Sequence, residues 1–362
     1  MLPTRFITAS AFLFMPVIPV GILGATGMVG QQFIALLARH PWFRVEWLGA
    51  SQRSEGKPYR DASAWRLPVP LGDEIARMTV DGAVPDRAPK LVFSGLDSSV
   101  AGEIEGAFAH AGHIVVSNAR NYRMEPTVPL LIPEVNADHL ALLSAQHSAR
   151  GWKGAIVTNP NCAVVVLAMA LAPLRQFGLE TVTITTMQAI SGAGYPGVAS
   201  WDILGNVIPY IGGGEEEKIE AETPKILGTL GAGGIDVHPA AISATTTRVP
   251  VANGHTGSIA VALTERPPLE AIIDAWRSFR GRPQALELPS APPQPIVYLE
   301  EPNRPQPALD VNRDGGMTVS VGRLRPCPAI GYKFIALGHN TIRGAAGAAI
   351  LNAELMHRKG LL

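Results

Sequence analysis

The segment that most constrains the fold lies near the start of the chain, where a short apolar strand, a glycine-rich turn and a helix follow one another directly. Residues 18–23 read as a buried strand and residues 31–39 as a helix. Glycines between them let the backbone approach a pyrophosphate on the helix N-terminus. Their spacing is not the usual dinucleotide fingerprint, so a tight turn without a ligand is the alternative. Because this is the first turn of the chain's first strand and helix, we expect cofactor contacts from Gly24, Thr26, Gly27, Met28 and Val29.

Strands and helices alternate beyond this turn, which predicts a parallel sheet with ligands at the carboxyl ends of its strands. Further strands are expected at residues 45–50, 90–96 and 113–118. The second strand lacks the terminal carboxylate that NAD enzymes use for the ribose, and the loop after it suits the 2′-phosphate of NADP through Ser51, Arg53 and Ser54. An ordinary polar loop is the alternative. Arg123, after the last of these strands, is a candidate for holding an anion, although a solvated loop arginine is the default.

A cysteine stands directly before a long apolar run. Pro160 cannot continue a strand, Asn161 is a good helix cap, and residues 163–171 are apolar throughout, so Cys162 is expected in the first turn of a buried helix. Free N–H groups and the helix dipole there favour a thiolate nucleophile with a lowered pKa. The same N–H groups and the Asn161 amide are candidates for holding an oxyanion. The alternative is a structural buried cysteine.

The second half of the chain mixes alternating strands with charged helices and predicts an α+β domain. Strands are expected at residues 181–186, 245–251 and 258–263, and a proline-rich stretch at 281–308 is interpreted as a surface excursion or partner-contacting arm. A helix rich in small residues at 341–356 is expected to pack against another element. We therefore predict a Rossmann-like doubly wound domain over 18–161, a second domain over 162–337, and a C-terminal segment, 338–362, that returns to the first domain.

Composition excludes several classes of protein. Apolar residues make up 47% of the chain and charged residues 17%, as in packed globular proteins, and the formal net charge is zero. No nucleic-acid or anionic-membrane partner is therefore expected, because both need a basic surplus. Two cysteines suggest no disulfide framework and fit a cytoplasmic protein. Residues 1–17 contain an apolar cluster too short to span a bilayer and are interpreted as a non-native or frayed extension.

Six motifs occur in an order that resembles one enzyme family. They are Gly24 to Gly30, Asn159 to Cys162, Gln188 to Gly194, Glu215 to Lys218, Arg248 to Val251 with Gly254 to Thr256, and His339 to Gly344. Together they resemble the aspartate-semialdehyde dehydrogenases over residues 18–358. The run from Ser117 to Arg123 and the Glu-Glu-Pro at 300–302 are more similar to the archaeal and fungal branch.

The resemblance implies a reaction and a cofactor. Cys162 would attack aspartyl-4-phosphate and expel phosphate, and the thioester would accept hydride from NADPH and release aspartate semialdehyde, in the biosynthesis of lysine, threonine, methionine and isoleucine. His255 would be the acid/base, although a histidine after Gly254 is otherwise an ordinary turn residue. Asn161 and Gln188 would orient the acyl group. The resemblance also implies a catalytic and dimerisation role for the second domain, a homodimer or homotetramer, and no metal.

It further implies how the substrate and nicotinamide are held. Arg248 would pair with the α-carboxylate, as its planar fork suits, and Glu215 with the α-ammonium. Lys218, one helical turn from Glu215, would help Arg123 with the phosphate. For Glu215 and Lys218 the alternative is a solvated helix face. The nicotinamide side would be lined by Ser191, Gly192, Gly194 and Asn340.

Three other functions stay open at this point. A malonyl-CoA reductase of the same branch would share the cysteine and histidine but need a different pocket around Glu215 and Arg248. An N-acetylglutamyl-phosphate reductase uses related chemistry on an acylated amine and would not need Glu215. A regulator that binds NADP without catalysis is a third possibility, against which the intact Cys162, His255 and Arg248 argue.

Overall fold

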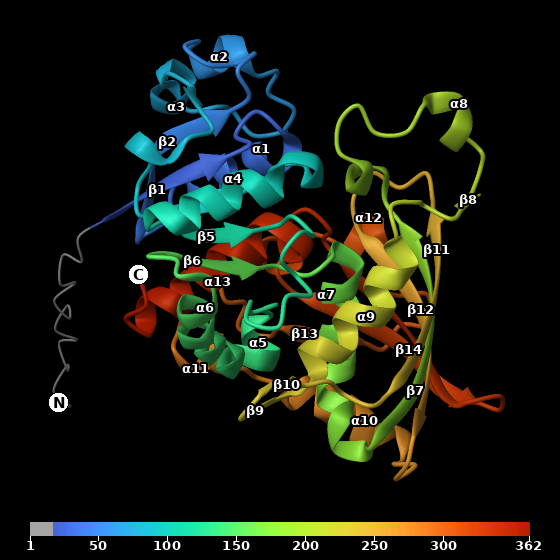
Figure 1. Ribbon diagram of the computed structural model, residues 1–362. Helices are drawn as coiled ribbons and strands as arrows, with labels where there is room; N and C mark the ends of the chain where they lie inside the picture. Colours follow the sequence, from blue (N-terminus) through green and yellow to red (C-terminus); the bar gives the residue numbers. More distant parts are fainter. Residues whose placement is uncertain (1–16) are drawn as a thin grey trace, which may run out of the picture.

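The computed structural model describes residues 17–362, so the extension predicted over 1–17 lies outside the described residues except for Val17. The described chain forms two large sheets, each with its own helices, and a third sheet of two short strands (Figure 1). The fold class predicted from the sequence, a doubly wound parallel sheet joined to an α+β domain, is confirmed.

The first sheet is parallel throughout, with six strands in the order β3-β2-β1-β4-β5-β6 within the described residues. Its strands are β1 (Ile18–Leu23), β2 (Phe43–Ala50), β3 (Asp81–Gly82), β4 (Leu91–Ser94), β5 (Ile114–Ser117) and β6 (Ala155–Thr158). Helix α1 (Met28–Leu37) packs on one face and α4 (Ser98–Ala111) on the other. Strands β4, β5 and β6 have four residues each, all of them buried, and burial on both faces is typical of a parallel sheet.

The second sheet is mixed and has seven strands in the order β13-β14-β15-β12-β7-β11-β8 within the described residues. These strands are β7 (Leu179–Gln188), β8 (Ile208–Pro209), β11 (Ala241–Arg248), β12 (His255–Leu263), β13 (Ile296–Leu299), β14 (Val319–Cys327) and β15 (Gly331–Gly338). Helices α7 (Cys162–Leu171), α9 (Glu215–Leu227) and α10 (Leu269–Ser278) lie on one side of it (Figure 1). Every residue of α7 after Cys162 is buried, which explains its uninterrupted apolar sequence.

The C-terminal segment joins the two parts. A π-helical turn, η6 (Ile342–Ala346), leads into α13 (Gly347–Arg358), whose apolar residues share a hydrophobic core with α1 and the first sheet. Arg343 in this turn makes a bidentate ion pair with Glu134 at 2.8 and 2.7 Å, and both side chains are fully buried. The small residues of the segment allow this close packing.

Two details differ from the sequence-based expectation. The proline-rich stretch is not only a surface excursion, because β13 within it pairs in parallel with β14 and forms an edge of the second sheet. Helix α1 begins at Met28 and not at Gln31, since Gly27 already stands at its N-cap. Strands β9 (Thr229–Gly231) and β10 (Gly234–Asp236) pair with each other as a separate antiparallel sheet. The remaining elements are helices and helical turns: α2 (Tyr59–Ala62), α3 (Asp73–Arg77), η1 (Pro85–Arg87), α5 (Pro133–Asn136), η2 (Ala137–Ala141), α6 (Leu142–Arg150), η3 (Ala172–Phe177), η4 (Ile190–Ala193), α8 (Ser200–Ile203), α11 (Arg282–Ala285), α12 (Pro307–Asp310) and η5 (Arg313–Gly316).

Among the described helices, none has the length and apolar character needed to cross a membrane.

Candidate active site

Three polar side chains meet at the ends of three neighbouring strands of the second sheet. Gln188 ends β7 and Arg248 ends β11, and these residues are register partners because the two strands are parallel. His255 begins β12, which runs antiparallel to β7, so its start lies beside the end of β7. All three side chains are buried. The topology thus brings together residues that are up to 67 positions apart in the sequence.

Cys162 lies next to these strand ends, in the first turn of α7. Asn161 is the N-cap, and its Oδ1 accepts hydrogen bonds from the N–H groups of Ala163 at 2.9 Å and Val164 at 3.4 Å. The Sγ atom of Cys162 lies 3.1 Å from Nε2 of His255. A thiol and an imidazole at this distance are the minimal arrangement for a nucleophile and its acid/base.

The protonation of this pair is set mainly by burial. Burial, followed by the charge of Glu215, raises the pKa of the Cys162 thiol to about 12. Burial, followed by the charge of Arg248, lowers the pKa of His255 to about 3. Both shifts favour uncharged forms, so the lowered thiol pKa expected from the sequence is wrong for this arrangement. The N–H of Ala163 does lower the pKa, as the helix-terminus argument requires, but desolvation outweighs it.

The backbone around His255 provides both a donor and an acceptor. The Ala189 N–H donates to Nδ1 at 3.1 Å, and a hydrogen bond to the Gly254 carbonyl raises the pKa of the ring against the other influences. The bond from Ala189 fits the tautomer with its proton on Nε2, whereas the Gly254 carbonyl fits the tautomer with its proton on Nδ1, which leaves Nε2 free to accept the thiol proton.

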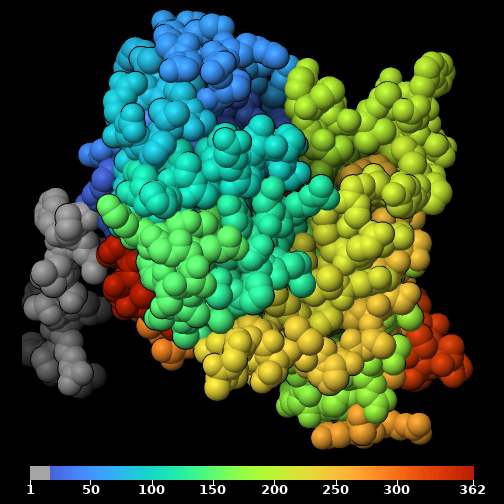
Figure 2. All heavy atoms as spheres, in the orientation of Figure 1, coloured from blue at the N-terminus to red at the C-terminus, as the bar shows by residue number. Residues whose placement is uncertain are grey.

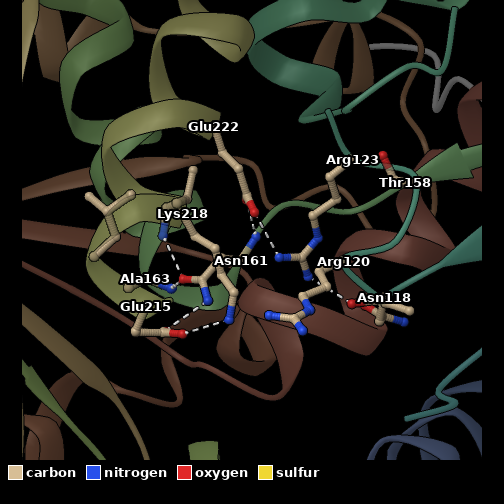
Figure 3. Close-up of polar contacts among 12 residues, drawn as sticks. Asn118, Arg120, Arg123, Thr158, Asn161, Ala163, Glu215, Lys218 and Glu222 are labelled. Atoms are coloured by element: carbon tan, nitrogen blue, oxygen red, sulfur yellow. Dashed lines mark hydrogen bonds and ion pairs between the residues drawn. The ribbon is translucent and has the colours of Figure 1, made fainter. Parts of the chain in front are cut away.

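The first turn of α9 supplies a carboxylate that gathers the neighbouring donors. Glu215 Oε1 accepts from Asn161 Nδ2 at 2.8 Å and from Gln188 Nε2 at 3.3 Å, and Oε2 accepts from Lys218 Nζ at 3.2 Å. Figure 3 shows Glu215, Asn161 and Lys218 pointing toward one another. We call Glu215, Asn161, Gln188 and Lys218 the Glu215 cluster.

Arg123 lies beside the Glu215 cluster but has partners of its own. Its Nη1 donates to Glu222 Oε1 at 2.9 Å and its Nη2 to the Asn118 carbonyl at 2.7 Å (Figure 3). Glu222 Oε2 also accepts from the Asn161 N–H at 2.7 Å. The sequence argument missed Glu222, although its spacing from Glu215 and Lys218 places it on the same face of α9. Arg123 remains a predicted phosphate ligand, here oriented by Glu222.

A loop after β7 closes the site over Arg248. Arg248 Nη1 donates to the Ala189 carbonyl at 2.7 Å. A Cβ at Gly192 would lie 2.8 Å from Arg248 Nη1 and 2.9 Å from His255 Cε1, so the loop's close approach requires glycine there. Asn340 bridges the loop and the residue before β12. Its Nδ2 donates to Ser191 Oγ at 2.8 Å, and its Oδ1 accepts from the Gly254 N–H at 2.8 Å. Gly194, at φ +71°, ends the loop's helical turn.

The glycine turn of the first domain has the shape that a pyrophosphate needs. Gly24 has φ +73°, and a Cβ at Gly30 would lie 2.3 Å from the Gly24 carbonyl oxygen, so neither position admits a side chain. Gly27, the N-cap of α1, offers no side-chain acceptor to the first N–H groups of the helix. These groups, with Thr26, Met28 and Val29 beside them, fit a phosphate.

The loop after β2 and a nearby groove extend this surface. Ser51 and Arg53 are exposed, Ser54 is buried, and the Ser54 N–H donates to the Ser51 carbonyl at 2.8 Å to close the turn. A groove of about 1100 Å³ runs along α1, and its lining includes Met28 and Ser191 together with residues of the 65–72 and 339–342 segments. In the space-filling view the surface is hollowed between the first domain and the yellow-green segment before α9 (Figure 2).

Comparisons with known proteins agree with this geometry. Two family models match the chain: "Semialdehyde dehydrogenase, NAD binding domain" over residues 19–143 and "Semialdehyde dehydrogenase, dimerisation domain" over residues 171–343. The aspartate-semialdehyde dehydrogenase of Cryptococcus neoformans is 49% identical over 96% of this chain and 99% of its own length. The chain belongs to the aspartate-semialdehyde dehydrogenase family.

Further members of the family show the same likeness. The enzyme of Archaeoglobus fulgidus is 47% identical over 95% of this chain and 99% of its own length. A crystal structure of the Candida albicans enzyme with NADP superposes with a TM-score of 0.88 at 42% identity, covering 96% of this chain and 100% of that one. The resemblance inferred from the six motifs is therefore confirmed, including its similarity to archaeal and fungal members.

Proposed function

We propose that the chain catalyses the NADPH-dependent reductive dephosphorylation of L-aspartyl-4-phosphate to L-aspartate 4-semialdehyde through a thioester on Cys162, in the biosynthesis of lysine, threonine, methionine and isoleucine. The observation that carries this proposal is the 3.1 Å contact between Cys162 Sγ and His255 Nε2 at the start of α7. Around it lie a buried arginine, Arg248, and a buried carboxylate, Glu215, which suit the two charges of an amino acid.

In the proposed mechanism Cys162 is the nucleophile and His255 moves the proton. The sulfur forms a bond to the acyl carbon of the substrate while the bond from that carbon to the phosphate oxygen breaks. The thiol proton passes to Nε2 of the tautomer that is protonated at Nδ1, and the same nitrogen later exchanges a proton with the oxygen of the hemithioacetal. Gln188 and Asn161 donate to the acyl oxygen. Collapse of the hemithioacetal breaks the carbon–sulfur bond and returns Cys162.

The substrate would be bound by the charged side chains around the strand ends where Gln188, Arg248 and His255 meet. Arg248 holds the α-carboxylate, Glu215 the α-ammonium, and Lys218 with Arg123 the phosphate. Holding the acyl carbon close to Sγ accounts for much of the rate, because misplacement by about 1 Å costs roughly 100-fold.

The cofactor has residues that fit it on both sides of the site. The glycine turn from Gly24 to Val29 would hold the pyrophosphate, and Ser51, Arg53 and Ser54 the 2′-phosphate. The nicotinamide site, next to His255 and Arg248, would be lined by Ser191, Gly192, Gly194 and Asn340. When bound, the nicotinamide supplies the hydride that reduces the thioester.

The assembly and compartment follow from the same reasoning. We propose a homodimer or homotetramer formed through the second domain, which one family model describes as a dimerisation domain. Both cysteines are free, which fits a reducing compartment such as the cytoplasm.

The test is turnover in the reverse direction. Aspartate semialdehyde with phosphate and NADP⁺ should yield NADPH, and the rate should depend on phosphate. Malonyl-CoA with NADPH serves as the competing reaction, because a CoA thioester brings no ammonium for Glu215. A preference for malonyl-CoA would overturn the proposal and assign the chain to the thioester reductases.

A further inference from the structure

The Glu215 cluster contains a conflict between two sets of partners. The proposed function needs Gln188 and Asn161 on the acyl oxygen and Lys218 on the phosphate, yet all three donate to Glu215 in the structure. For Gln188 the conflict is sharpest, because its two amide hydrogens are both used, one on Glu215 at 3.3 Å and one on Thr186 Oγ1 at 3.4 Å.

These donors cannot leave Glu215 without a replacement. The Glu215 side chain is buried, with about 10% of its surface exposed. A buried carboxylate stripped of its donors is costly, since neither water nor protein then compensates its charge. The donors therefore turn toward a ligand only when that ligand brings its own cation to the carboxylate.

We propose that the α-ammonium of the substrate exchanges with Asn161, Gln188 and Lys218 on Glu215 and thereby releases these three donors to the acyl phosphate. The positive charge of the ammonium, with one or two of its N–H bonds directed at the carboxylate, replaces the three donor contacts, so the charge of Glu215 stays compensated. Glu215 is then a specificity-determining residue that couples recognition of the amine to assembly of the acyl site. This inference rests on the proposed function.

The exchange also reaches the nucleophile. Asn161 caps α7 immediately before Cys162, so a new partner for its amide lies next to the sulfur. Glu215 is the charge that raises the pKa of the Cys162 thiol most after burial, and an ammonium placed on it opposes that effect. A substrate without the amine leaves the donors in place and the sulfur protonated.

A simple ion pair and the exchange make different predictions for a substrate that lacks only the amino group. Succinate semialdehyde is that substrate, assayed with phosphate and NADP⁺. If Glu215 only contacts the ammonium, removing its charge lowers kcat/KM for aspartate semialdehyde and leaves succinate semialdehyde unchanged. If Glu215 withholds the donors, removing its charge raises kcat/KM for succinate semialdehyde, by about 10–100-fold given the usual cost of an unsatisfied buried group.

The experiment compares the full-length wild type with Glu215→Ala and Glu215→Gln, each checked for cooperative thermal unfolding. Glu215→Gln keeps the shape of the side chain and serves if the smaller residue impairs folding. Glu217→Ala is the matched control, because Glu217 is an exposed acid in the same turn of α9. The expected result is a gain on succinate semialdehyde in both Glu215 variants and no change in the control.

Two failures are distinguishable. If the wild type and Glu217→Ala oxidise aspartate semialdehyde but a folded Glu215 variant shows no gain on succinate semialdehyde, the exchange is wrong and the proposed function stands. If the wild type does not oxidise aspartate semialdehyde with phosphate, the proposed function itself fails.

Discussion

Gly344 offers a direct way to displace the nucleophile without touching it. A Cβ at this position would lie 2.7 Å from Cys162 Cβ and 3.0 Å from Cys162 Cα, which belong to the start of α7 and not to a flexible side-chain end. The Gly344→Ala substitution needs no unusual backbone conformation, since Gly344 is not at positive φ. The strain must therefore be relieved by moving Cys162 and the π-helical turn η6 apart.

The size of the effect follows from that contact. Relieving it requires a shift of about 0.3–0.7 Å, against a distance of 3.1 Å between Sγ and His255 Nε2. We expect kcat/KM to fall about 10–100-fold, or about 1.4–2.7 kcal/mol of transition-state stabilisation. Overpacking should also cost about 1–3 kcal/mol of stability.

A neighbouring glycine separates displacement of the nucleophile from general strain. Gly347→Ala, three residues on, would place its Cβ 2.5 Å from Met317 Sδ and 2.9 Å from Ile342 Cγ2, and Cys162 is not among its three nearest atoms. Both variants are compared by phosphate-dependent NADP⁺ reduction and by urea unfolding. For a similar loss of stability, Gly344→Ala should lose far more activity than Gly347→Ala. Equal activity losses in the two variants would refute the geometric reasoning.

Three further predictions concern stability and cofactor choice. Glu134→Gln should cost about 3–5 kcal/mol in urea unfolding because it leaves Arg343 buried without its ion pair, and adding Arg343→Met should recover most of that loss. Burial raises the pKa of Glu105 to about 7, so the folded state holds an extra proton between about pH 4.5 and 7 and loses stability as pH rises through that window. Glu105→Gln should remove this pH dependence, which amounts to a change of up to about 3 kcal/mol in the free energy of unfolding, measured by comparing unfolding at pH 5 and pH 8. Arg53→Ala should weaken NADPH by about 10–150-fold and leave NADH nearly unchanged in steady-state kinetics, and a retained preference for NADPH would mean that other residues read the 2′-phosphate.

The sequence predicted the parts of the molecule that depend on local patterns. The glycine turn from Gly24 to Gly30 and the alternation that follows it determine the parallel sheet, and Asn161 before an apolar run determines where α7 begins. The same local reasoning placed Cys162 in the first turn of that helix. The family resemblance came from the order of six such motifs.

The parts that the sequence did not predict depend on contacts between distant residues. Neither the pairing of Arg123 with Glu222 nor the approach of Gly344 to Cys162 has a local signal, because each joins segments about 100 or more positions apart. The raised pKa of Cys162 likewise reflects burial by the assembled domains, which outweighs the helix terminus. Strand β13 was missed because prolines surround its four residues.

The most direct test of the account is to trap the acyl group on the proposed nucleophile. Enzyme mixed with aspartate semialdehyde and NADP⁺ without phosphate is quenched in acid and analysed by peptide mass spectrometry. The account predicts an aspartyl thioester on the peptide containing Cys162 that disappears when phosphate is added, together with one NADPH formed per acylated site. An unmodified Cys162 peptide in a burst that nevertheless produces NADPH, or an acyl group on another residue, would contradict it.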